Sequence, residues 1–204
     1  MTAPVGSAPI GSAPVSTPLV ARSVLVSAAA AGVCAVWAAA VWAAVHLRAD
    51  PLLHDVALFV HLACLIVGFG AVLTVDWLGL LWLLGKRPLT EVLRAADAVH
   101  PPIWLGLAGL VGSGMLLHPD PGALLARVKL GLVLVVALNG LHAWTLQPRL
   151  TALSSGALSP SPSPSPSPSR GSRRALVARC AAGVLVSQLG WWGATAIGFL
   201  NSRR

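Results

Sequence analysis

The sequence predicts an all-α protein, a polytopic transmembrane helical bundle of about five spans. Apolar residues make up 56% of the 204 residues and charged residues only 10%, whereas a soluble domain averages about 25% charged residues. The apolar residues gather into five long segments, and each reaches or approaches the ~20 residues that cross ~30 Å of hydrocarbon. A chain this apolar requires the bilayer as its solvent.

The apolar segments follow a tail, residues 1–21, whose Pro, Ser and Ala content predicts disorder. Four predicted transmembrane helices lie within residues 22–146, and the fifth lies within residues 175–204 with a short basic tail. The five segments cover about 23–46, 53–84, 99–117, 123–146 and 175–200. The first is Ala-rich and the least apolar, so it either spans the membrane or lies at the edge of the bundle. The third begins at His100-Pro101-Pro102, because prolines suit the first turn of a helix.

The connections between these segments are polar. Residues 85–98 predict a charged loop or surface helix, and residues 118–122 (HPDPG) predict a tight turn. Residues 147–174 hold a Ser-Pro repeat and are predicted to form an extended cytoplasmic linker.

Basic residues in the connections predict the orientation. Most of them flank the same ends of the segments, and that side is expected to be cytoplasmic. The N-terminus is then cytoplasmic and the C-terminus outside, in a plasma or inner membrane. The net charge of +8 predicts contact with anionic lipid head groups at the Arg-rich loops. Nucleic acid is an unsuitable partner, because the basic residues lie between apolar runs instead of forming a solvated face.

Small residues recur at intervals that bring helices close together. Gly106, Gly109 and Gly112 do so in the third segment, and Gly190, Ala194 and Gly198 do so in the fifth. Such seams let helix backbones approach closely in lipid. They predict a compact bundle, and they leave open a homo-oligomer or another membrane partner.

Ionisable residues at membrane depth are costly and mark candidate functional sites. His54, His61 and Asp76 fall on one stripe of the second segment, at seven- and fifteen-residue spacings. With His118 at the end of the third segment, they are candidate metal ligands. Each also has a structural interpretation, as an interfacial residue or as a hydrogen-bond partner that holds helices together.

Pairs of histidines on different helices can clamp a haem iron. The predicted topology places His100 with His142 near the inner side, and His61 with His118 near the outer side. Lys129 lies near the outer end of the fourth segment. Neutral imidazole also suits copper, which is the alternative cofactor.

Several enzyme classes lack support in the sequence. The chain has no GxxxxGK[ST], HExxH, GxSxG or CxxCH pattern. It has one glutamate, Glu91, in a connection, so paired-carboxylate catalysis inside the membrane is not expected. It has no tyrosine, so a tyrosyl donor or radical is excluded. The cysteines, Cys34, Cys64 and Cys180, lie singly in apolar runs, as buried cysteines do.

Residues 58–146 resemble a four-helix membrane superfamily. The carrying features are FVHLACLIVGFGAVLTVDWLGLL, a short basic connection, HPPIWLGLAGLVGSGMLL, and ARVKLGLVLVVALNGLHAW. This order resembles the superfamily that contains the copper-resistance D membrane domain and the HemJ-like protoporphyrinogen oxidase. The resemblance implies a haem-related role for His61 and Lys129. The chain departs from the HemJ-like branch in having no Tyr, and from the copper branch in having only Met115 within a helix.

Three functions remain open from the sequence. The first is binding of haem b or a related porphyrin for redox or porphyrin chemistry, through His61, Lys129, His100 and His142. The second is transport of copper, protons or a small solute along the His54–His61–Asp76 stripe. The third is a structural or accessory membrane subunit without chemistry of its own, so the sequence does not decide whether the protein is an enzyme.

Overall fold

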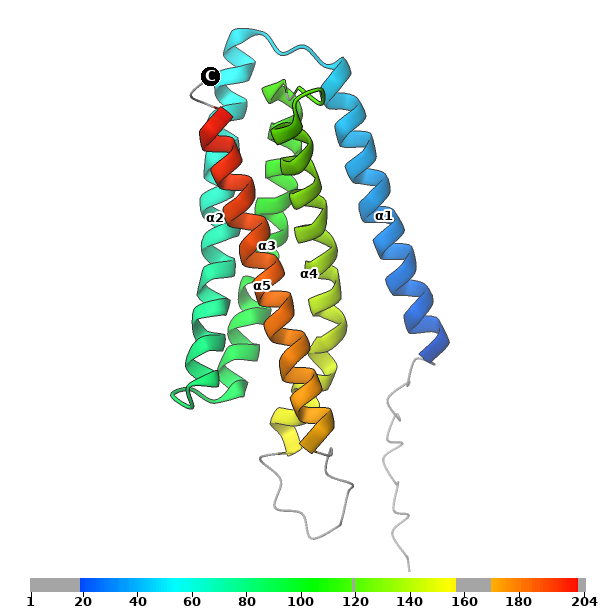
Figure 1. Cartoon of the computed structure of the whole chain (residues 1–204), viewed down its shortest axis with the longest axis vertical. Helices are drawn as coiled ribbons and strands as arrows, with labels where there is room; N and C mark the ends of the chain where they lie inside the picture. Colours follow the sequence, from blue (N-terminus) through cyan, green and yellow to red (C-terminus); the bar gives the residue numbers. More distant parts are fainter. Residues whose placement is uncertain (1–18, 119, 157–169, 202–204) are drawn as a thin grey trace, which may run out of the picture.

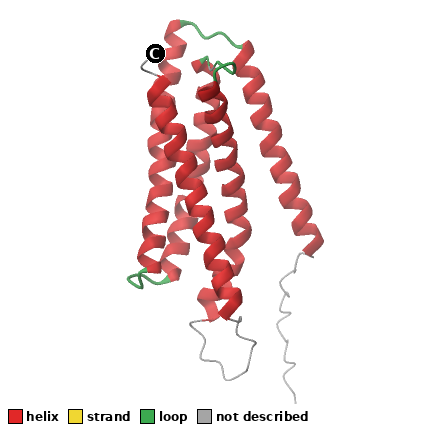
Figure 2. Cartoon of the chain, viewed as in Figure 1, coloured by secondary structure: helices red, strands yellow, loops and turns green. Residues whose placement is uncertain are grey.

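The computed structural model describes residues 19–118, 120–156 and 170–201. Five α-helices follow one another up and down the long axis (Figure 1). They are α1 (Leu19–His46), α2 (Pro51–Leu83), α3 (Leu89–Gly114), α4 (Leu124–Gly156) and α5 (Arg170–Asn201), with the 3₁₀ turn η1 (Met115–Leu117) after α3. The described residues contain no strand (Figure 2). The predicted all-α class is therefore confirmed, and all five helices are long and apolar enough to cross a membrane.

Helices α2 to α5 form the bundle, and α1 lies at its edge (Figure 1). The connections at residues 47–50 and 120–123 mark the upper end of the bundle, and residues 84–88 mark its lower end. Helix α1 is held near its middle by the Trp37 indole N–H, which donates to the Leu130 carbonyl at 3.1 Å. At the lower end, Arg22 donates to the Thr145 carbonyl at 3.0 Å. The first helix is thus peripheral to the bundle. The expectation that it is the least apolar segment is wrong, because the spans of α3 and α5 are less apolar.

Helices α2 and α3 pack closely because glycines face each other across their contact. A Cβ added at Gly106 would lie only 2.6 Å from Gly68 Cα and 2.8 Å from the Cys64 carbonyl oxygen. Only glycine permits so close an approach of two backbones. The connection is also short, and Gly85 adopts a positive φ of 69° within it. The predicted glycine seam in the third segment is confirmed for Gly106 and Gly109, which both face α2, but is wrong for Gly112, where an added Cβ meets nothing within 4 Å.

The second close pair is α4 with α5, and larger side chains join it to α2 and α3. Gly190 of α5 faces α4, where an added Cβ would lie 2.3 Å from Val136 Cγ2. Between the two pairs, the Trp191 ring stacks on Phe69 at a centroid distance of 5.4 Å. This stack lies in the core cluster, whose buried members also include Val72, Leu107, Leu110, Val136 and Ala137.

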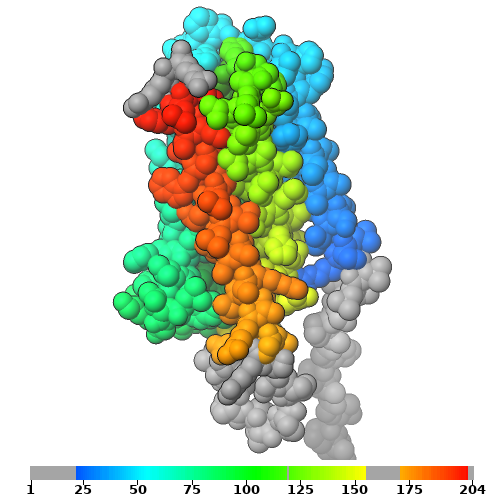
Figure 3. Space-filling view, viewed as in Figure 1, coloured from blue at the N-terminus to red at the C-terminus, as the bar shows by residue number. Residues whose placement is uncertain are grey.

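The outer surface of the bundle is apolar. Large side chains such as Phe59, Ile66, Leu105 and Leu189 are more than 70% exposed. A soluble monomer rarely exposes so much contiguous apolar surface, whereas lipid accepts it. Figure 3 shows α5 lying along α4 on the face in view, with α1 at the edge. The fold therefore has the surface of a multi-span membrane protein.

The structure corrects the boundaries of the third helix. It begins at Leu89 after Pro88, so Pro101 and Pro102 lie inside α3 instead of in its first turn. Most of residues 85–98 thus belong to a helix that continues into the apolar segment. Membrane helices tolerate internal prolines, because neighbouring groups satisfy the backbone carbonyls that lose their hydrogen bonds. The predicted turn after α3 is confirmed by the hydrogen bond from Gly122 N–H to Asp120 Oδ1 at 2.8 Å.

The ends of the fourth and fifth helices also differ from the predicted ones. Helix α4 extends to Gly156 and α5 already begins at Arg170, so the helices take up both ends of the segment predicted as a linker. The Ser-Pro repeat and most of the N-terminal tail lie outside the described residues.

Candidate functional site

Polar side chains from three helices of the bundle meet near its upper end. We call His61 of α2, Ser113 of α3 and Lys129 of α4 the upper polar group. The close α2/α3 contact brings His61 Nδ1 to 3.0 Å from Ser113 Oγ. Glycine at position 114 leaves room beside the imidazole, because a Cβ there would lie 3.5 Å from His61 Cε1.

The hydroxyl of Ser113 determines which nitrogen of His61 carries the proton. Ser113 Oγ lies 2.5 Å from the Gly109 carbonyl oxygen, and a carbonyl can only accept, so the single hydroxyl proton points there. Toward His61, Ser113 must then accept, and Nδ1 must be the donor. A neutral His61 with its proton on Nδ1 presents an unprotonated Nε2.

The second nitrogen of His61 has no side-chain partner among the described residues. The hydrogen bond of the imidazole to another side chain is made by Nδ1, and the ring is half-buried. An imidazole that is oriented through one nitrogen, with the other left for a ligand, is the arrangement that metal-ligating histidines adopt.

Lys129 brings a cation to the same region. Its side chain is half-buried on α4. Its Nζ lies beside α5, where a Cβ added at Gly198 would be 3.7 Å away. Among the described residues, the one ion pair joins Arg87 to Glu91, so no acidic side chain there pairs with Lys129. The ammonium is therefore available to a carboxylate from a ligand.

His118 lies at the upper end, where it stacks on His54 and not on His61. The two rings are parallel, with centroids 5.7 Å apart. His118 adopts a left-handed backbone conformation with φ 47°, and its Nε2 accepts the backbone N–H of Ala49 at 2.9 Å. His118 Nε2 thus holds the connection between α1 and α2. The structure pairs His118 with His54, and the expected pair of His61 with His118 is not formed by these contacts.

The two histidines predicted for the other pair, His100 and His142, are both exposed. His100 Nε2 accepts the Trp104 indole N–H at 2.9 Å, within α3. The backbone carbonyl of His142 accepts from the Thr145 hydroxyl at 2.6 Å, within α4. These hydrogen bonds therefore do not link α3 to α4.

Asp76 belongs to a different group nearer the lower end. We call Asp76 of α2 with Gln188 and Trp192 of α5 the lower polar group. Gln188 Nε2 donates to Asp76 Oδ2 at 2.5 Å, and Gln188 Oε1 accepts the Trp192 indole N–H at 3.0 Å. Both ends of the Gln188 amide are used. Asp76 thus acts as a hydrogen-bond partner that holds α2 and α5 together.

The three residues of the α2 stripe thus have three different partners: His118 for His54, Ser113 for His61 and Gln188 for Asp76. Within residues 19–118, 120–156 and 170–201, no group of three or more His, Cys, Asp or Glu side chains is placed to hold a metal ion. Sequence reasoning missed Ser113, although a hydroxyl within the glycine-rich end of the third segment was the available signal.

No protein-family description, curated protein or solved structure significantly matches this chain. The resemblance to the copper-resistance D and HemJ-like superfamily stays a prediction. The features that indicate a function are therefore the two polar groups and the surface of the bundle.

Proposed function

We propose that this multi-span membrane protein binds haem b or a related porphyrin near the upper end of the α2–α5 bundle, with His61 as the axial ligand. The proposal rests on the chain of two hydrogen bonds that runs from His61 Nδ1 through the Ser113 hydroxyl to the Gly109 carbonyl. It orients the imidazole and leaves Nε2 unprotonated, as an iron ligand requires. A bound haem would supply redox chemistry that the protein side chains lack.

The donor set around His61 fits a porphyrin better than a bare metal ion. One imidazole nitrogen suffices for a haem, whose other four iron ligands belong to the porphyrin itself. A protein-only metal site needs about three or four side chains, and no such group exists among the described residues. Lys129 would pair with a propionate, which is the charged part of the ligand.

Binding of a large flat ring requires side chains near His61 to move. Two surface grooves of the described chain lie elsewhere: one is lined by Arg48, His118 and Asp120, and the other lies between α4 and α5 at the lower end. Neither includes His61. The ligand would therefore displace lipid or side chains beside α2, and spectroscopy is a better first test than docking.

Absorption spectra of detergent-purified protein from haem-replete cells test the proposal. The wild type should show a Soret band and, after dithionite, sharpened α and β bands, and His61→Ala should lose them. His46→Ala is the matched control, because His46 is exposed and bonds within α1, to the Trp42 carbonyl. A featureless wild-type spectrum, also after addition of hemin, would overturn the proposal.

Two further variants separate the roles of the other candidate residues. Lys129→Met should weaken hemin affinity about tenfold, since one charge-assisted pair contributes roughly 1.5 kcal/mol, whereas Lys129→Arg should retain it. The double variant His100→Ala/His142→Ala should leave the spectrum intact. If it abolishes the Soret band while His61→Ala does not, the ligands belong to that pair.

Transport of copper, protons or a small solute is a second candidate. Its support is that α2 carries His54, His61 and Asp76 at three depths, about 10 and 22 Å apart along the helix. Those separations exceed hydrogen-bond reach, so passage would need water or movement between the positions. Metal uptake that is equal in cells with and without the protein would exclude the copper form.

An accessory role is supported by the lower polar group, whose side-chain hydrogen bonds join α2 to α5. Both ends of the Gln188 amide have a partner within the protein. Co-purification of a partner in fixed ratio, with no chromophore, would favour this function over haem binding.

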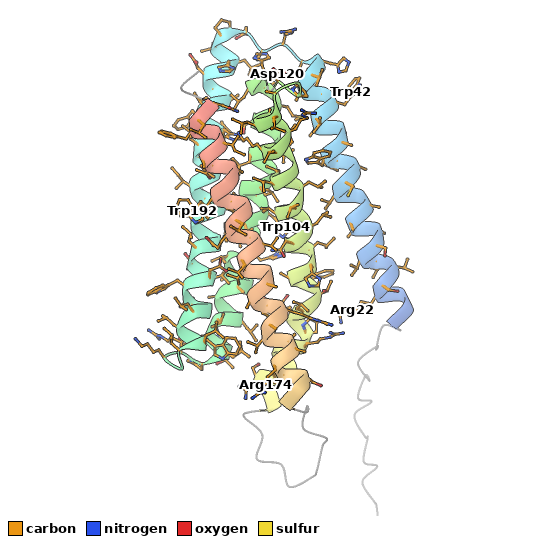
Figure 4. The ribbon with its side chains drawn as sticks, viewed as in Figure 1. Arg22, Trp42, Trp104, Asp120, Arg174 and Trp192 are labelled. Atoms are coloured by element: carbon orange, nitrogen blue, oxygen red, sulfur yellow. The ribbon has the colours of Figure 1, made fainter. Side chains whose placement is uncertain are left out.

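We further propose that the lower end of the bundle faces the cytoplasm. The supporting observation is the charge at that end, where Lys86, Arg87, Arg149 and Arg173 lie at helix ends or connections. Figure 4 shows Arg22 and Arg174 at the same end. Such residues concentrate on the cytoplasmic side of membrane proteins. Labelling of single cysteines introduced at Arg87 and at Asp50 by a membrane-impermeant reagent should reach only position 50 from outside intact cells.

A further inference from the structure

Three arginines line a groove at the lower end of the bundle. Arg149 comes from α4, and Arg173 and Arg179 come from α5. The groove has a volume of about 580 Å³, and its other lining includes Ala152, Leu153 and Leu176. Leu176 is buried and the three arginines are exposed. The groove therefore joins a cationic rim to an apolar floor.

Nothing in the described protein neutralises the arginines of this groove. No acidic side chain lines it, and the one ion pair among the described residues is the Arg87–Glu91 pair of another connection. Helix α5 also has no acidic residue in its first turn, where negative charge is favoured and positive charge is not. A cluster of like charges that costs folding free energy is expected to serve an anionic ligand.

The position of the groove identifies the chemical class of that ligand. The candidate spans Leu124–Ser154 and Gly171–Asn201 each have 31 residues, more than the ~20 that cross the hydrocarbon. We therefore expect their lower ends, with the groove, to lie in the head-group region. Long arginine side chains reach such a boundary from within a span. A soluble anion would leave the leucine floor in water, whereas a phospholipid covers it with an acyl chain.

We propose that this groove is a binding site for one anionic phospholipid, with its phosphate between Arg149, Arg173 and Arg179 and an acyl chain against Leu153 and Leu176. Guanidinium groups suit phosphate because they donate two parallel hydrogen bonds. A zwitterionic lipid fits less well, because its own cation would face three arginines. The site is independent of His61 and of any bound porphyrin.

The test compares two triple variants of the full chain that remove equal charge from the same end. The groove variant is Arg149→Ala/Arg173→Ala/Arg179→Ala, and the control is Lys86→Ala/Arg87→Ala/Arg94→Ala. Each is equilibrated in neutral detergent with equal amounts of phosphatidylglycerol and phosphatidylcholine. Native mass spectrometry then counts the lipids that remain bound. Far-UV circular dichroism checks that both variants are folded, and Arg179→Gln alone serves as a milder groove variant.

We expect the wild type and the control to retain phosphatidylglycerol in preference to phosphatidylcholine. The groove variant should bind phosphatidylglycerol at least about tenfold more weakly, because each lost charge-assisted bond already accounts for that factor. Arg179→Gln should give an intermediate loss. Equal retention by the groove variant and the control would overturn the proposal. So would equal retention of both lipids by the wild type, or complete displacement of phosphatidylglycerol by an excess of inorganic phosphate.

Discussion

The upper and lower polar groups both contain an ionisable residue of α2, but that residue is bonded differently in each. In the lower group, Gln188 donates to one carboxylate oxygen of Asp76 and accepts from Trp192, so side-chain bonds join α2 to α5. In the upper group, Ser113 engages one nitrogen of His61 and holds the ring in a fixed orientation. The cost of burying a polar residue in a membrane is therefore met in two ways. The lower group stabilises the bundle, whereas the oriented imidazole of the upper group is a candidate ligand.

The largest expected effect comes from forcing α2 and α3 apart. A side chain at position 106 would meet the Gly68 backbone at 2.6 Å and the Cys64 carbonyl at 2.8 Å. Gly106→Val should therefore destabilise the bundle by about 3 kcal/mol, the upper end for overpacking, and should also separate His61 from Ser113. Unfolding in detergent by increasing dodecyl sulfate measures the stability.

The control for this experiment is Gly112→Val in the same helix, where an added Cβ meets nothing within 4 Å. It should leave the unfolding midpoint nearly unchanged. If the two variants are equally stable, the close α2/α3 contact does not position the upper polar group.

The next effect concerns the lower group alone. Asp76→Leu leaves the Gln188 amide without its acceptor and should cost about 1–2 kcal/mol of stability. The double variant Asp76→Leu/Gln188→Leu should recover part of this loss, because the amide that lacked its acceptor is gone, while the Trp192 indole N–H loses its bond to Gln188. Hemin affinity should not change in either variant. A marked loss of hemin binding would show that the upper and lower polar groups are coupled and do not act independently.

A subtler effect is expected at Ser113. Ser113→Ala removes the acceptor that orients His61, and loss of such a partner weakens ligand binding by roughly 10-fold, or about 1.4 kcal/mol. Titration of purified protein with hemin measures this change. Ser187→Ala, a change at a half-buried serine of α5, should bind hemin as the wild type does. Equal affinity in the two variants would show that Ser113 does not orient His61 for hemin binding.

The smallest effect is expected at the edge of the bundle. Trp37→Phe removes the hydrogen bond to the Leu130 carbonyl and should loosen α1 by about 0.5–1 kcal/mol. Hydrogen exchange should rise in α1 and stay unchanged in α2 to α5. If hemin affinity falls as well, α1 belongs to the site and the site is larger than the upper polar group.

The sequence predicted the number and approximate place of the helices because the bilayer imposes a long apolar segment on each span. The start of α3 could not be predicted in this way. Residues 89–98 are polar enough to resemble a connection, and the rule that places proline in a first turn has exceptions where neighbouring helices compensate for the lost bonds. Their helical state depends on packing that one segment does not encode.

Candidate residues could be predicted singly but not in their groups. Polarity at membrane depth identified His54, His61, Asp76 and Lys129. Pairing depends on the rotation of each helix about its own axis, which the α2/α3 glycine contact determines. That rotation directs His61 to Ser113 and leaves His118 to stack on His54. Ser113 was missed because an uncharged hydroxyl in a helix has no marked cost by itself.

The bond between Gln188 and Asp76 joins residues 112 positions apart, and this separation has a consequence for biosynthesis. At about 5–20 residues per second, a ribosome needs roughly 6 to 22 s to make Gln188 after Asp76. During that interval α2 enters the membrane with a carboxyl group that its eventual partner has not yet reached. Early insertion of α2 thus depends on its own hydrophobicity and on its neighbour α3, and arrival of α5 completes the assembly.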